Sequence, residues 1–120
     1  MIWVAIALAG GLGAACRFAL DHAVTTRLGA ALPWGTILVN VSGSLGAGVV
    51  AGLAASAVLP EPWRLVVAGG FLGAYTTFST AMVDSLRLVE HGAPLRAVVN
   101  LLLPLVLAIL AALAGWWLVA

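Results

Sequence analysis

Long runs of apolar residues dominate the chain, and polar residues gather in short breaks between them. A helix that crosses the hydrocarbon core of a bilayer needs ~20 mostly apolar residues, and four runs reach this length. They extend from about 2 to 23, 33 to 59, 62 to 89 and 94 to 119. The pattern therefore predicts an all-α membrane protein with four transmembrane helices, in which residues 1–120 form a single membrane domain.

The third apolar run is interrupted by small and polar residues close to its middle. Three glycines thin residues 69–73, and the sequence Thr-Thr-Phe-Ser-Thr then places four hydroxyl groups within residues 76–80. Glycine lowers helix propensity, and Ser and Thr side chains compete for backbone hydrogen bonds. We therefore expect the third helix to be broken near its middle. Non-helical backbone at membrane depth is tolerated only inside protein or beside a watery cavity, so this stretch is a candidate site.

Composition agrees with a protein whose solvent is lipid. Of the 120 residues 64% are hydrophobic and 8% are charged, which is more apolar surface than a small soluble domain can bury. The five basic residues are all arginines and form no basic patch, so the sequence argues against nucleic-acid binding. Cys16 is the single cysteine, which excludes an internal disulfide. No nucleophile with its base, phosphate loop or metal centre is evident, so we do not expect an enzyme.

Arginines are distributed unevenly between the two ends of the predicted bundle. Arg64 lies on the side of both termini, whereas Arg27, Arg87 and Arg96 lie on the opposite side. The positive-inside rule then favours an orientation with both termini outside the cell. Three arginines against one is a weak bias, so insertion in both orientations is also permitted.

The second apolar run carries small and polar residues on one face. Asn40, Ser44, Gly48 and Gly52 follow one another at four-residue steps, which places them on one side of a helix. An unpaired amide in hydrocarbon is costly, so Asn40 needs a partner. Two interpretations stay open, a hydrogen bond to another helix or a donor that lines a pore.

The first apolar run combines glycines with one charge. We interpret the glycines of residues 10–13 as a close helix contact, because small residues let backbones approach. An arginine within a membrane helix usually faces protein or water. Arg17 is therefore either the partner of Asp21, four residues further on, or a group that attracts anions.

Three blocks of sequence together resemble the CrcB/Fluc family of fluoride channels. They are Gly-Gly-Leu-Gly-Ala-Ala-Cys-Arg-Phe at 10–18, Gly-Thr-Ile-Leu-Val-Asn-Val-Ser-Gly-Ser at 35–44 and Gly-Gly-Phe-Leu-Gly-Ala-Tyr-Thr-Thr-Phe-Ser-Thr at 69–80. The resemblance covers essentially the whole chain. It implies a channel of the inner (plasma) membrane that exports toxic fluoride passively. It also implies an antiparallel dual-topology dimer in the lipid bilayer, with pores at its interface and a structural sodium ion (Na+) at its centre.

The same resemblance implies roles for individual residues. The backbone carbonyls of Gly73 and Thr76 would hold the sodium ion, and Phe78 would be the first of two phenylalanines whose ring edges contact fluoride. Arg17 would lie near the aqueous vestibule. The remaining pore residues would be Asn40, Ser44, Thr77, Ser79 and Thr80.

One departure from the family pattern concerns the second phenylalanine, which is Ala81 in this chain. Two explanations follow: a homodimer that conducts through altered pores, or a heterodimer in which a second family member supplies the intact pair. The weak bias toward one orientation favours the heterodimer, because a subunit of fixed orientation needs an oppositely oriented partner. A non-conducting assembly subunit would also explain Ala81, but it leaves the polar face of Asn40 without a purpose.

A proton-coupled exporter of the small multidrug type is the alternative from another class. Such an exporter is also short and four-helical, but it needs a carboxylate buried in the membrane. The carboxylates of this chain all lie at or near predicted helix ends, at Asp21, Glu61, Asp84 and Glu90. Neutral donors in mid-membrane suit an anion better than a cationic drug.

Overall fold

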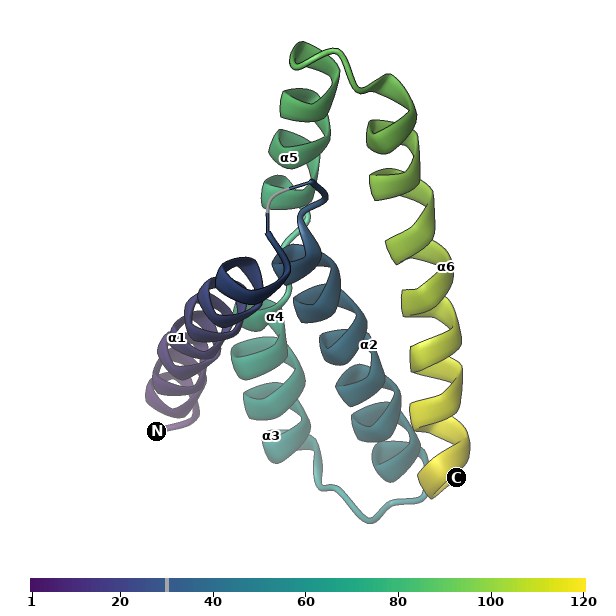
Figure 1. Ribbon diagram of the computed structural model, residues 1–120. Coiled ribbons are helices and arrows are strands. Elements are labelled where there is room, and N and C mark those ends of the chain that lie inside the picture. The colour runs from purple at the N-terminus through teal and green to yellow at the C-terminus, as the bar shows by residue number, and fades with distance from the viewer. Residues whose placement is uncertain (30) are drawn as a thin grey trace.

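The computed structural model describes residues 1–29 and 31–120, and these residues form a bundle of helices (Figure 1). Four helical spans in the described residues are long and apolar enough to cross a membrane. Three spans are continuous: α1 (Ile2–Leu28), α2 (Trp34–Ala55) and α6 (Pro94–Val119). The third span consists of α3 (Glu61–Arg64), η1 (Leu65–Leu72), α4 (Gly73–Tyr75) and α5 (Ser79–Glu90).

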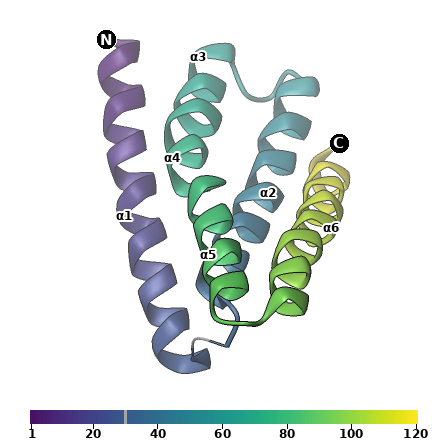
Figure 2. The same ribbon diagram turned by 90° about the horizontal axis from the view of Figure 1, so that it is seen from above.

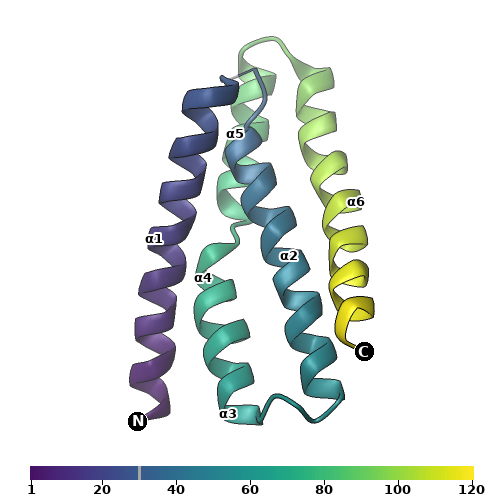
Figure 3. The ribbon, with the colours of Figure 1, turned by 60° about the horizontal axis from the view of Figure 1, so that its bottom comes forward.

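The third helix is broken, as the sequence predicts. Residues 76–78 leave the helical conformation between α4 and α5 (Figure 3). The glycine-rich part before the break is a π-helix, η1. The two halves have different neighbours, since η1 and α4 pack on α1 whereas α5 packs on α6. The break therefore lets one span contact both sides of the bundle.

Two helix ends differ from those expected. The first helix continues beyond residue 23 to Leu28 and ends at Gly29, whose φ is 78° and whose N–H donates to the carbonyl of Thr25 at 3.1 Å. The second ends at Ala55 rather than near residue 59. Its chain turns at Ala57, whose φ is 56°, and the carbonyl of Leu53 accepts the N–H of residue 58 at 3.0 Å.

Glycines bring the helices together at two crossings. A Cβ atom built on Gly13 would overlap the carbonyl of Phe71, so α1 and η1 touch through backbone atoms. Gly48 of α2 and Gly115 of α6 are in equally close contact with the backbone of the opposite helix. The close contact predicted for the first helix is therefore confirmed. Such contacts matter in a membrane, because lipid supplies no hydrophobic force between helices and close packing must hold them together.

The ends of the bundle separate two sets of connections. Both termini and the connection from α2 to α3 lie at one end, and the connection from α5 to α6 lies at the other (Figure 2). The break in the third helix lies well inside the bundle's length, beside α2 (Figure 3). It therefore lies at membrane depth, away from both sets of connections.

Candidate functional site

The break begins at Thr76, where the backbone becomes extended. The φ and ψ angles of Thr76 are −79° and 157°, far from helical values. Its N–H still donates to the carbonyl of Leu72 at 3.0 Å, and its hydroxyl donates to the same oxygen at 2.9 Å. The carbonyl of Leu72 at the end of this half-helix therefore accepts hydrogen bonds from both the N–H and the hydroxyl of Thr76.

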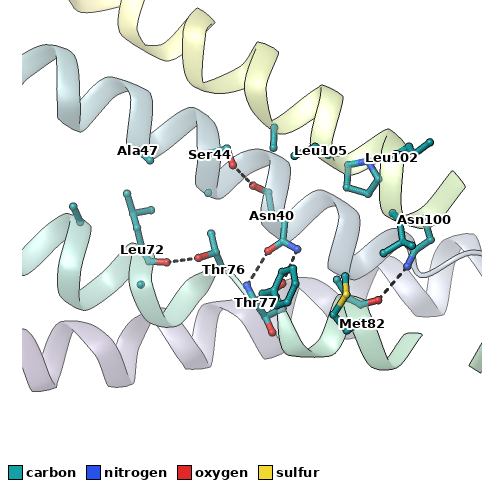
Figure 4. A pocket seen from close by; sticks show the side chains of 18 residues that line it. Asn40, Ser44, Ala47, Leu72, Thr76, Thr77, Met82, Asn100, Leu102 and Leu105 are labelled. Carbon is teal, nitrogen blue, oxygen red and sulfur yellow. Dashed lines mark hydrogen bonds between the residues drawn. The ribbon is translucent and has the colours of Figure 1, made fainter. Parts of the chain in front are cut away.

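Asn40 of α2 pairs with the unwound residue Thr77 through two hydrogen bonds. The Asn40 Nδ2 group donates to the carbonyl of Thr77, and the N–H of Thr77 donates to Asn40 Oδ1, both at 2.8 Å (Figure 4). A side-chain amide carries the same donor and acceptor as a peptide group. Asn40 therefore satisfies the N–H and the carbonyl of Thr77, which the break leaves without helical partners. The hydrogen bond to another helix, the first of the two interpretations of Asn40, is thus present.

Two carbonyls before the break lack the N–H donors that a continuous helix would give them. In a continuous helix the N–H of Thr77 would bond the carbonyl of Gly73, and the N–H of Thr80 would bond that of Thr76. Here the first N–H donates to Asn40 Oδ1, and the second donates to Thr77 Oγ1 at 3.3 Å. These two carbonyls are the ones predicted to hold a cation, and both lack their usual helical donor.

Three residues after the start of the break are exposed in the single chain. The ring of Phe78 is 77% exposed, and Ser79 and Thr80 are exposed as well. The hydroxyl of Thr77 donates to that of Thr80 at 3.0 Å. Phe78 borders the groove described next, whereas Thr80 lines the cavities beside α1, and Thr77 lines both the groove and one of these cavities.

A groove of roughly 750 Å³ runs between α2, the third helix and α6 (Figure 4). Apolar side chains of α6, such as Leu102 and Leu105, form its far wall. The groove brings together six of the predicted site residues: Asn40, Ser44, Gly73, Thr76, Thr77 and Phe78.

Arg17 lies in a separate, smaller cavity of roughly 110 Å³, which Thr77 and Thr80 also line. Its guanidinium carbon is 5.4 Å from the centre of the neighbouring Phe18 ring. Among the described residues the ion pair is Glu61 with Arg64, so the pairing of Arg17 with Asp21 is not formed. The arginine is therefore beside the break but outside the groove.

A wider cavity, of roughly 650 Å³, opens at the end of the bundle where α5 meets α6. Thr36 donates to Asp84 Oδ2 at 3.0 Å at this point. Thr80 lines both this cavity and the small one, and Thr77 lines both the small one and the groove. The basic residues of the wide cavity are Arg87, His91 and Arg96.

Sequence reasoning missed the partnership of Thr36 and Asp84. It placed Asp84 among the carboxylates at or near helix ends and named no partner, whereas this carboxylate accepts a hydrogen bond from Thr36 of α2. A signal was present, because Thr36 lies four residues before Asn40 and so shares its helix face.

Asn100 of α6 forms a second contact that spacing did not reveal. Its side chain is 2% exposed, and its Nδ2 group donates to Ser85 Oγ at 2.7 Å and to the carbonyl of Ala81 at 3.3 Å. The Ser85 hydroxyl donates to that carbonyl as well, at 2.8 Å. This cluster fastens α5 to α6 directly behind the position where the family pattern has a phenylalanine.

The chemistry of the site is that of neutral donors beside an aromatic ring. Hydroxyl and amide groups donate hydrogen bonds, and the edge of an aromatic ring is electropositive. Such groups suit a small anion. No group of three or more His, Cys, Asp or Glu side chains within residues 1–29 and 31–120 could hold a metal, whereas freed backbone carbonyls are ligands that bind sodium in unwound membrane helices.

Comparison with known proteins gives one result. The sequence model described as CrcB-like protein, Camphor Resistance (CrcB), matches residues 4–116. A protein of Mycobacterium tuberculosis named fluoride-specific ion channel FluC 2 is 42% identical over 116 residues, covering 97% of this chain and 89% of the relative. FluC 1 of Leifsonia xyli is 40% identical over 118 residues, covering 98% and 86%. FluC of Vibrio cholerae is 43% identical over 115 residues, covering 94% and 91%.

Proposed function

Because this chain belongs to the CrcB-like protein family, we propose that it is a fluoride-selective channel that exports fluoride passively. It is a multi-pass protein of the plasma membrane, and its relatives are named as ion channels rather than enzymes. The relatives named fluoride-specific match nearly its full length. The proposal extends that specificity to this chain.

The observation that carries the proposal is the opening of the third helix at membrane depth. The break exposes Phe78 beside the hydroxyls of Thr77, Ser79 and Thr80. Polar, unwound backbone of this kind is stable in a membrane only beside protein or water. An ion pathway beside the break would provide the water that this surface needs.

The donors of this surface match the needs of fluoride. A pore must replace the water around this strongly hydrated ion with other donors, and it must bind the ion weakly enough to release it. Hydroxyls, a ring edge and the remaining N–H of the Asn40 amide meet both needs without a fixed charge. Arg17 lies in the adjoining cavity rather than in the groove, which suits a role in attracting anions to the vestibule.

The cavities also support a route to the break. The wide cavity at the bundle end is lined by Arg87 and Arg96 together with Asp21 and Asp84, and its arginines offer positive charge to an entering anion. Thr80 lines both this cavity and the small one, and Thr77 lines both the small one and the groove. Ions would enter at the arginines and pass the hydroxyls in this order.

A second subunit would complete the site. Phe78 and the groove face outward, and lipid is a poor neighbour for exposed Ser79 and Thr80. An antiparallel dual-topology dimer would cover both grooves and enclose a pore at each. The subunit is either a second copy of this chain or another family member, and the latter would supply the phenylalanine that Ala81 replaces.

A sodium ion would stabilise the centre of such a dimer. The carbonyls of Gly73 and Thr76 have lost their usual helical donors to Asn40 and Thr77, and sodium prefers oxygen ligands of this kind. Gly73 is exposed and lines the groove that a partner would cover. The ion would supply a positive charge that satisfies carbonyls facing the interface.

Fluoride efflux from liposomes that hold only the purified chain tests this function. A fluoride electrode should record fast efflux after the membrane potential is released, and a chloride electrode should record none. Efflux of both ions would contradict selectivity. Absence of fluoride efflux from folded protein would contradict the homodimer, and co-expression with a second family member would then test the heterodimer.

A further inference from the structure

We propose that Asn40 is a positioning residue that fixes the unwound Thr77 peptide of the broken third helix, in addition to any contact it makes with the ion. Its side-chain amide forms two bonds of 2.8 Å with the peptide groups of Thr77 (Figure 4). The functional consequence of this role rests on the proposed channel, but its geometry does not.

The bonding capacity of the amide supports this role. An asparagine side chain offers one carbonyl oxygen and two N–H donors. Thr77 uses the oxygen and at least one N–H. One N–H at most is left for an ion, so most of the hydrogen-bonding capacity of Asn40 serves the backbone.

Asn40 also lies on a helix that is closely packed in the bundle. It lies in the continuous helix α2, which touches α6 through the backbone at Gly48 and Gly115. Its own carbonyl accepts the hydroxyl of Ser44 at 2.8 Å. A fixed donor and acceptor on α2 can therefore set the position of Thr77, whose N–H and carbonyl both bond the Asn40 side chain.

Two features of the site depend on this contact. Holding the N–H of Thr77 keeps that donor away from the carbonyl of Gly73. Phe78 follows Thr77 directly, so the placement of its exposed ring follows the placement of that peptide. One side chain thus positions both the freed carbonyl and the aromatic ring.

The break does not simply close when Asn40 is lost. Closing it requires Thr76 to change from ψ 157° to a helical value, which would pull α5 toward α4. Asn100 holds α5 to α6 through Ser85 at 2.7 Å and opposes this movement. Removing Asn40 therefore leaves the N–H of Thr77 without a partner.

Hydrogen exchange of the Thr77 amide, followed by NMR in detergent micelles, measures this directly. In Asn40→Ala the Thr77 amide should exchange about tenfold faster, because it loses its only partner beside a groove that water can enter. Asn40→Asp keeps the acceptor Oδ1, so its Thr77 amide should stay protected. Ser56→Ala is the matched control, since it removes a hydroxyl that bonds only the carbonyl of Gly52, four residues earlier at the end of α2.

The outcomes separate a positioning residue from a simple ligand. If Asn40 only contacts the ion, both Asn40 variants slow fluoride efflux while Thr77 exchanges as in the wild type, and the proposal is overturned. Equal acceleration in Ser56→Ala would also overturn it, because the effect would then be a general loosening of the bundle. Wild-type protein that conducts no fluoride would refute the proposed function while leaving the exchange result to decide the role of Asn40.

Discussion

Two asparagines within the membrane spans solve the same physical problem on different helices. An amide in hydrocarbon must be bonded, and both side chains find their partners on the third helix. Asn40 bonds the unwound peptide of Thr77, whereas Asn100 bonds Ser85 and the carbonyl of Ala81 behind the groove. The two amides therefore brace the break from α2 and the half-helix after it from α6.

Ala81 offers a gain-of-function test at the level of one residue. Ala81→Phe places a second ring beside the groove that Phe78 borders, so a homodimer should conduct fluoride severalfold faster. Initial efflux rates from liposomes measure the change. Ala47→Phe adds the same volume to the α2 wall of the same groove and should not raise the rate. A rate for Ala81→Phe that falls with the control would mean that the second ring has no place in this pore.

Sodium dependence tests the carbonyls of Gly73 and Thr76. Replacing sodium with N-methylglucamine during purification should lower the thermal stability of the proposed dimer and slow fluoride efflux, because two carbonyls without their helical donors would lose the cation proposed to bind them. Readdition of sodium should restore both, and potassium at the same concentration is the control for ionic strength. A dimer that is as stable in N-methylglucamine as in sodium would argue against a sodium site.

Among the elements, the third helix shows what sequence can and cannot predict. Its break was predictable, because glycines and hydroxyl side chains weaken a helix at a definite place. The π-helical form of η1 was not, although η1 meets α1 closely where Gly70 lies against the carbonyl of Ile6 and Gly13 lies against that of Phe71. Contact with a neighbouring helix decides such detail, and a single sequence carries no signal for it.

The candidate site likewise has features that the sequence predicts and features that only the fold reveals. A four-residue spacing placed Asn40 and Ser44 on one face, and the groove contains both. Spacing along one helix could not show that Asn40 pairs with Thr77, or that Thr36 bonds Asp84, because these partners lie 37 and 48 residues apart. The resemblance named residues near the break, whereas only the fold shows which groups are already bonded.

The crossing of α1 with η1 gives a prediction at the level of elements. Gly13→Ala should destabilise the protein by about 1–3 kcal/mol, because its Cβ atom would overlap the backbone carbonyl of Phe71. Thermal unfolding in detergent measures the loss. Gly11→Ala is the control, since a Cβ there meets nothing within 4 Å. It should change stability by at most about 1 kcal/mol. Equal losses in both variants would mean that the crossing is not close.

At the scale of the whole molecule, the exposed site predicts a dimer that contains both orientations. Light scattering in detergent should give the mass of two chains, since one chain leaves Phe78 and its groove uncovered. Glu90→Cys in a Cys16→Ser background places one thiol in the last turn of α5, at one end of the bundle. An impermeant maleimide should label about half of the chains from outside.

Two other results would change this account of the assembly. A monomer mass would contradict the dimer. Complete labelling or no labelling would show one orientation only, and a chain of fixed orientation needs an oppositely oriented partner to form an antiparallel pair. That outcome would replace the homodimer with the heterodimer and leave the site itself in place.

The most direct test of the central claim is fluoride efflux through the Phe78→Ile variant. If the break is the ion path, replacing this ring should slow efflux from liposomes about tenfold or more, because an aliphatic side chain has no electropositive edge. Trp117→Leu is the matched control, since Trp117 is also 77% exposed but lies near the far end of α6. The account predicts slow efflux for Phe78→Ile and wild-type efflux for Trp117→Leu. Wild-type efflux through folded Phe78→Ile would contradict it.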